Sequence, residues 1–197
     1  MSKVFKVLAI SALLLGLAVG AHASIVQNGN FDANTPPSGT APLGWILTQA
    51  SSGSDFFVGA MPTYGALSAP NSANFGAVGS FDDVLYQVLT TVSGQSYTLD
   101  FWLSHDSTNS SNDFSVLWNS TTLLSLVNTA SFNWTEYTYT VVGSGSDTLT
   151  FSGREVPAWY GVDNVTVTPT VPEPGSLMLF GSGVLGLAGL LRRKFGV

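Results

Sequence analysis

The chain contains no cysteine, only two histidines and only 9% charged residues over its 197 positions. Without cysteine it can form neither a disulfide framework nor a thiolate site for zinc or iron–sulfur, and it has no thiol nucleophile. Soluble domains usually carry about 25% charged residues, so the apolar residues must be concentrated somewhere. They are concentrated at the two ends of the chain.

The N-terminal end, residues 1–23, has the three parts of a secretory signal peptide. Lys3 and Lys6 precede an apolar run over residues 7–19, and the small-x-small triplet 21–23 follows. The run is too short to cross about 30 Å of hydrocarbon as a helix. Cleavage after Ala23 would make Ser24 the first residue of the exported protein.

The C-terminal end, residues 171–197, has the layout of a short membrane anchor. A Pro-Glu-Pro-Gly segment leads into the apolar stretch 176–191, predicted to be a single transmembrane helix, and the basic residues 192–194 follow on the cytoplasmic side. At 1.5 Å per residue this helix would span about 24 Å, and its four glycines lower its helix propensity. We therefore expect a transient anchor.

These C-terminal elements resemble the PEP-CTERM sorting signal of Gram-negative bacteria, with Pro172, Glu173 and Pro174 as its tripeptide. The resemblance implies processing by an exosortase, a membrane transpeptidase-like cysteine protease. It also implies export, with a pause in the inner membrane, to the cell surface or an extracellular polysaccharide matrix. An ordinary C-terminal anchor is the alternative interpretation.

Between the two ends, residues 24–171 carry one base, Arg154, and eleven acids, which gives a formal charge of −10. Binding of nucleic acid needs a basic face that neutralises phosphates. The composition therefore excludes nucleic acid as a partner, whereas it attracts divalent cations.

Residues 24–170 are predicted to be an all-β domain. Apolar and polar residues alternate over Ser96–Ser104, with Tyr97, Leu99, Phe101 and Leu103 on the core side, and again over Thr135–Val142. About nine short strands separated by turn residues predict a sandwich of two antiparallel sheets. Leu149 and Phe151 mark one further strand, and the others are expected at 45–48, 56–59, 84–89, 114–118 and 160–168.

A series of short motifs in this domain resembles the galactose-binding-like jelly rolls, which include several carbohydrate-binding modules. The motifs are Asn28-Gly29-Asn30-Phe31-Asp32, Gly44-Trp45, Gln87-Val88, Gly94 to Leu99 and Tyr160 to Val165. The resemblance implies a two-sheet antiparallel jelly-roll sandwich.

In such modules the acid of the opening motif and an aspartate of the last strand often hold a structural calcium ion, and the corresponding residues here are Asp32 and Asp163. Asp163 shares strand parity with Val165 and Val167, which predicts that it points inward, where an unpaired carboxylate is costly. The alternative is that both aspartates accept hydrogen bonds from backbone N–H groups at turns.

Catalysis is disfavoured by what the domain contains. His105 is its only histidine once the signal peptide is removed, and we interpret His105-Asp106 as a solvated strand end. A paired-carboxylate glycosidase needs acids on both sides of a cleft, and Glu136 or Glu155 could supply one of them, but no partner is discernible. We predict that the protein is not an enzyme, with a polysaccharide-active hydrolase as the alternative.

The aromatic residues favour a binding function. Trp102 lies on the polar face of its predicted strand, whereas Arg154 and Glu155 share a loop with Trp159. An aromatic ring offers a flat apolar platform to the C–H side of a pyranose, and polar groups bond its hydroxyls. Packing in the core is the alternative for each tryptophan. The predicted ligand-binding residues are Trp102, Trp134, Arg154, Glu155 and Trp159.

The sequence thus predicts an exported, non-catalytic β-sandwich protein of the extracellular polysaccharide matrix or cell surface, adhesive or structural, that binds carbohydrate. Ice binding is a further alternative, because Thr-x-Thr pairs recur at 138/140, 148/150 and 166/168. A change of sheet between these strands would break such a threonine ladder.

Overall fold

The computed structural model describes residues 23–106 and 111–170. The predicted signal peptide, the sorting tripeptide and the predicted membrane helix lie outside the described residues. Within them there is no helix, and hence none that could span a membrane.

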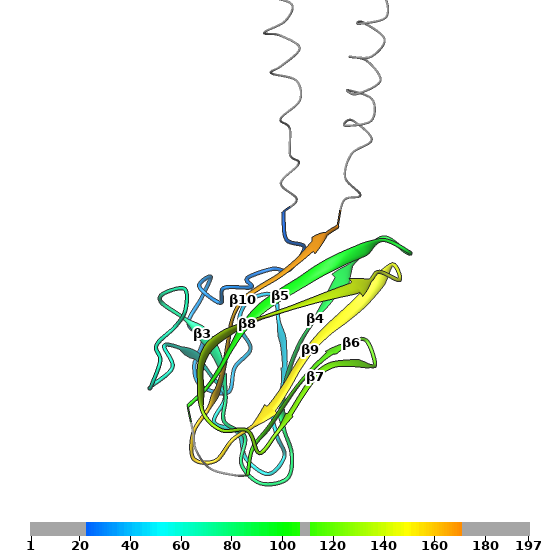
Figure 1. Ribbon diagram of the computed structural model, residues 1–197. Helices are drawn as coiled ribbons and strands as arrows, with labels where there is room; N and C mark the ends of the chain where they lie inside the picture. The colour runs from blue at the N-terminus through cyan, green and yellow to red at the C-terminus, as the bar shows by residue number, and fades with distance from the viewer. Residues whose placement is uncertain (1–22, 107–110, 171–197) are drawn as a thin grey trace, which may run out of the picture. The chain divides into compact units, whose positions relative to one another are not determined.

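The described residues form a sandwich of two antiparallel five-stranded sheets (Figure 1). This confirms the predicted all-β architecture. Sheet A has the order β1-β4-β9-β6-β7, and sheet B has the order β2-β3-β10-β5-β8. The strands are β1 (Ile46–Thr48), β2 (Phe57–Gly59), β3 (Ser72–Phe75), β4 (Asp83–Thr90), β5 (Ser96–His105), β6 (Asp113–Trp118), β7 (Thr121–Val127), β8 (Phe132–Val142), β9 (Ser146–Arg154) and β10 (Tyr160–Pro169).

The core lies between the two sheets and follows the alternation in the sequence. The side chains of Leu99 and Phe101 on β5 are buried, and Phe101 packs edge-to-face on Phe151 of β9 with ring centroids 5.4 Å apart. Phe75 of β3 contacts Phe114 of β6 in the same way. Burial of such rings is the main favourable contribution to folding.

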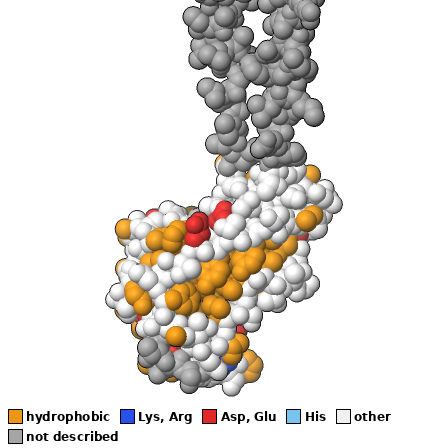
Figure 2. Space-filling view, in the orientation of Figure 1, with side chains coloured by type: hydrophobic (Ala, Val, Ile, Leu, Met, Phe, Trp, Pro, Cys, Tyr) orange, Lys and Arg blue, Asp and Glu red, His pale blue; other side chains and the backbone are white. Residues whose placement is uncertain are grey.

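The β8 side of the sandwich is less completely closed. Tyr137 and Tyr139 of β8 and Leu124 and Leu126 of β7 pack against the core but stay partly exposed. In the space-filling view, apolar side chains form a band between β8 and sheet A (Figure 2).

The first and last described segments meet at one end of the domain (Figure 1). The Ile25 N–H donates to the Val167 carbonyl at 2.9 Å, and the hydroxyl of Ser24 accepts the Val167 N–H at 3.1 Å. The Thr170 N–H donates to the Ser96 carbonyl at 2.9 Å. Backbone hydrogen bonds therefore tie Ile25 to β10 and Thr170 to the start of β5.

One long connection crosses the outer face of sheet B. Residues 60–71, which we call the strap, join β2 to β3. The strap bonds residues of β5 and β10: the Ser104 hydroxyl contacts the Met61 sulfur at 3.0 Å, and the Ser68 N–H donates to Asp163 at 2.8 Å. It covers the β10 side of this face.

Candidate functional site

Three of the predicted ligand-binding tryptophans, Trp102, Trp134 and Trp159, lie on the outer face of sheet B. Trp102 lies on β5 opposite Glu136 of β8 and Asp163 of β10. Because its strand neighbours Phe101 and Leu103 are buried in the core, the Trp102 ring lies on the outside, where it is half-buried. Trp102 therefore lies on the polar face, as predicted, but only part of its side chain is exposed.

Two glycines make room for the other two tryptophans. A Cβ at Gly161 would lie 2.9 Å from the Trp134 ring and 3.0 Å from the Met61 sulfur, so only glycine lets Trp134 extend over β10. A Cβ at Gly76 would lie 2.5 Å from Nε1 of Trp159. Both tryptophans are half-buried, on the same face as Trp102.

Polar groups flank Trp102 on the β8 side, which the strap leaves open. Glu136 is exposed, and the neighbouring pair along the strands is Asp100 and Thr138, whose hydroxyl donates to the Asp100 carboxylate at 2.7 Å. Thr98 and Thr140 form the next pair. The site therefore combines a partly exposed indole ring with two carboxylates and several hydroxyls. Asp100 and Thr138 were not among the predicted site residues, although the alternation around Trp102 places Asp100 on its face.

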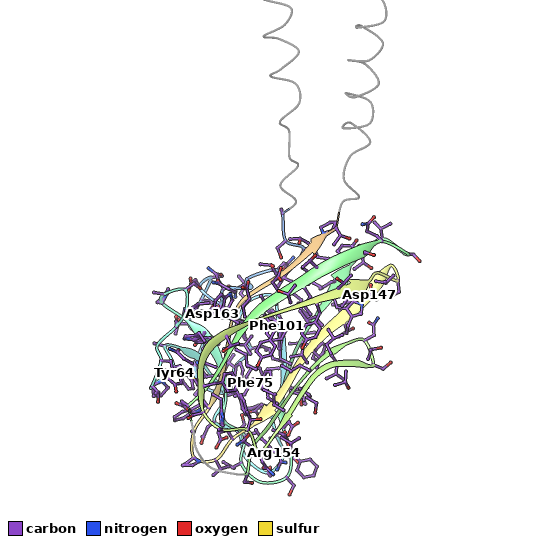
Figure 3. All side chains as sticks on the ribbon, viewed as in Figure 1. Tyr64, Phe75, Phe101, Asp147, Arg154 and Asp163 are labelled. Atoms are coloured by element: carbon purple, nitrogen blue, oxygen red, sulfur yellow. The ribbon has the colours of Figure 1, made fainter. Side chains whose placement is uncertain are left out.

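The parity argument predicted that Asp163 points into the core, and this prediction is wrong. The β10–β5 register shifts between Asp163 and Thr166, and this bulge moves Asp163 to the outer face opposite Trp102. There the strap buries it completely (Figure 3). Burial raises its pKa to about 6, although hydrogen bonds from Ser68 and Asn164 oppose the shift.

The predicted calcium ligands Asp32 and Asp163 are both engaged in hydrogen bonds. Asp163 accepts the N–H and hydroxyl of Ser68 and the N–H of Asn164, at 2.8, 3.0 and 2.7 Å. Asp32 accepts the Asn71 N–H at 3.0 Å and the Asn30 amide at 2.9 Å. These donors match the alternative of capped backbone N–H groups rather than an oxygen cradle for a cation. No cluster of three or more His, Asp or Glu side chains suited to a metal occurs within the described residues. Calcium binding here stays a prediction of the sequence.

Arg154 and Glu155 do not join Trp159 in one binding loop, so this part of the predicted site is wrong. Arg154 ends β9 on the outer face of sheet A (Figure 3), where its guanidinium pairs with Asp113 and lies 3.4 Å from Asp82. Glu155 is turned inward and is 1% exposed. Consecutive strand residues point to opposite faces, which separates the two side chains.

Glu155 instead pairs with His105 in the core, and this corrects the interpretation of His105 as a solvated strand end. The His105 Nε2 and Glu155 Oε2 atoms are 2.6 Å apart, and both side chains are fully buried. The His105 ring stacks on Tyr160 with centroids 4.1 Å apart. Burial and the nearby Glu155 raise the pKa of Tyr160.

Comparison with known proteins supports both the sorting signal and the fold. Residues 170–194 match the family model of the PEP-CTERM protein-sorting motif. The chain therefore carries a PEP-CTERM sorting signal, which implies export and processing by an exosortase. No curated protein sequence matches the chain.

The similar solved structures are jelly-roll domains. TmCBM61 in complex with beta-1,4-galactotriose is 16% identical with a TM-score of 0.56, and the match covers 75% of this chain and 99% of that one. The K1 cleaved adhesin domain of Lys-gingipain from Porphyromonas gingivalis W83 is 16% identical with a TM-score of 0.54, over 72% and 96% of the two chains. The domain thus has the jelly-roll fold of carbohydrate-binding modules.

Proposed function

We propose that the exported domain binds carbohydrate through the outer face of sheet B and acts as an adhesive or structural component of the extracellular polysaccharide matrix or cell surface. The observation that carries this proposal is the partly exposed ring of Trp102 beside Glu136 and Asp100. The sorting signal supports export, and the galactotriose complex of TmCBM61 shows that a domain of this fold binds a sugar.

The geometry suits a sugar ring that lies flat on the sheet. The indole of Trp102 stacks on the apolar C–H face, as aromatic platforms do. The carboxylates of Asp100 and Glu136 accept hydrogen bonds from sugar hydroxyls, and the hydroxyl of Thr138 can donate or accept. Trp134 lies on the strap side of this group, where it extends over β10 and its Nε1 is buried.

Two observations support a non-catalytic role. Asp163, whose pKa of about 6 would suit a general acid, lies beneath the strap with both oxygens bonded and no exposed surface. Glu155 is in the core beside His105. Neither acid can touch a glycosidic oxygen on the open face.

A polysaccharide-active hydrolase is the second candidate, because Glu136 and Asp100 are diagonal neighbours on adjacent strands of the open face. Paired carboxylates on one face are what glycoside hydrolysis requires. Turnover that is lost in Glu136→Gln would establish it in place of simple binding.

The test is a screen of residues 24–170 against neutral, acidic and amino glycans, with product detection. We expect binding without cleavage, and a loss of at least tenfold in affinity in Trp102→Ala. Phe81→Ala is the matched control, since Phe81 is an aromatic residue that is 58% exposed and lies next to β4 of sheet A. Equal effects of the two substitutions would contradict the site.

A further inference from the structure

The free edge of β8 is the longest unpaired strand edge of the domain. Among the described residues β8 pairs only with β5, on one side, and it has 11 residues. The other edge strands are shorter: β1 and β2 have three residues each, and β7 has seven. Unpaired N–H and C=O groups along a strand are a template for another strand, and proteins usually protect them with lysine or proline. Residues 132–142 contain neither.

Apolar side chains lie along the same side of the sandwich. The side chains of Tyr137 and Tyr139, two residues apart on β8, both point toward sheet A. There Leu124 and Leu126 of β7 are also partly exposed. Figure 2 shows these strands bordering a continuous apolar band. A band of this kind beside a free strand edge marks a surface for a protein partner.

The charge distribution indicates a second copy of this chain as the partner. Residues 24–171 have a formal charge of −10, so two copies repel each other over most of their surface. Residues 121–142, which span β7 and β8, contain Glu136 as their single charged residue. Two copies can therefore approach along this side without bringing many carboxylates together.

We propose that two copies of the chain pair through β8, antiparallel and about a twofold axis, so that their B sheets join into one ten-stranded sheet. This inference rests on the fold and not on carbohydrate binding. The dimer would place the two Trp102 faces on one continuous sheet surface, since the outer faces of both B sheets become adjacent.

The register follows from the regular part of the strand. The β5–β8 ladder is continuous from Thr135 to Val142 and shifts before Thr135. A twofold axis at Thr138 superposes residues 135–141 of this regular part on themselves. It puts Glu136 opposite the second copy's Thr140 and Tyr137 opposite its Tyr139, whereas an axis at Glu136 would oppose two carboxylates.

Sedimentation equilibrium of residues 24–170, which contain the whole hydrophobic core, tests the proposal. We expect a mass twice that of the monomer at micromolar concentration. Thr140 is exposed, so it can be changed without loss of the fold. Thr140→Lys should lower the dissociation constant of the dimer several-fold, because each lysine would face a Glu136 of the other copy. Thr140→Glu should raise it several-fold, because two carboxylates would then face each other.

The same two substitutions at Thr148 provide the control. Thr148 lies on the outer face of β9 in sheet A, away from β8, and lysine or glutamate there changes the total charge by the same amount. We expect no change in mass for these variants. A monomeric wild-type domain, or equal shifts for the changes at Thr140 and Thr148, would overturn the proposal, even if glycan binding by Trp102 were established.

Discussion

The imidazole of His105 and the carboxylate of Glu155 meet inside the sandwich, with Nε2 and Oε2 2.6 Å apart and no exposed surface on either side chain. The other ring nitrogen, Nδ1, lies 3.3 Å from the Ala130 carbonyl oxygen. The pair thus joins the ends of β5 and β9 to the turn before β8. It is a buried polar contact in the core, separate from the proposed glycan face.

Removal of Glu155 should be strongly destabilising. Glu155→Ala leaves the His105 Nε2 atom buried without a partner and creates a cavity, so we expect a loss of about 3 kcal/mol in the free energy of unfolding. Urea denaturation at pH 7 measures it. The matched control is Glu136→Ala, because Glu136 is exposed on β8. For this variant we expect a loss of less than about 0.5 kcal/mol in the free energy of unfolding. A loss below about 1 kcal/mol for Glu155→Ala would contradict the pairing.

Asp147 should be a second stabilising carboxylate, at the opposite end of β9 from Arg154 (Figure 3). Burial raises the pKa of Asp147, but hydrogen bonds from Thr91, Ser144 and Asn119 outweigh it and lower the pKa to about 2. The stabilisation is present above the unfolded pKa near 4 and is lost as the pH falls through 2. We expect Asp147→Asn to cost about 2 kcal/mol at pH 7. In urea titrations, a difference between variant and wild type that is as large at pH 2 as at pH 7 would argue against this origin.

Asp163 should give the opposite pH dependence. Its folded pKa of about 6 lies above the unfolded value of 3.8, so between these values the folded state holds a proton that the unfolded state has released. Stability therefore falls as the pH rises from about 4 to 6. We expect a higher Tm at pH 5 than at pH 7, and a smaller difference in Asp163→Asn.

Some of this dependence should remain in Asp163→Asn, because burial also raises the pKa values of Asp82 and Asp83. Thermal melts of the wild type and the variant across this pH range provide the measurement. Identical profiles for the two proteins would exclude Asp163 as the titrating group.

The predicted calcium site can be tested by thermal melts with calcium and with a chelator. Because the oxygens of Asp32 and Asp163 already accept hydrogen bonds, we expect the same midpoint in both conditions. A calcium-dependent rise that Asp163→Asn abolishes would instead establish the ion between the first and last segments of the domain.

The fold could be predicted where the sequence alternates, as along β5 and β8. β3 and β7 were missed for identifiable reasons. All four residues of β3 are buried, including Ser72 and Asn74, so no polar face marks the strand. In β7, consecutive leucines at 123 and 124 hide the period of two.

The candidate site could be predicted only in part. The outward position of the Trp102 side chain follows from strand parity. That Trp134 and Trp159 share its face depends on the pairing of β5, β8 and β10, which are far apart in the sequence. One bulge moves Asp163 to the outer face. The buried partner of Glu155 is His105, 50 residues away. Such long-range pairings leave no local signal in the chain.

The most direct test of the glycan face is an NMR titration of residues 24–170 that follows the five tryptophan indole N–H signals. With a glycan that the screen identifies, we expect the signal of Trp102 to shift. Trp45 and Trp118, each 5% exposed in the core, should not move. Shifts confined to other tryptophans, or a saturable binding curve with Trp102 unperturbed, would contradict carbohydrate binding on the outer face of sheet B.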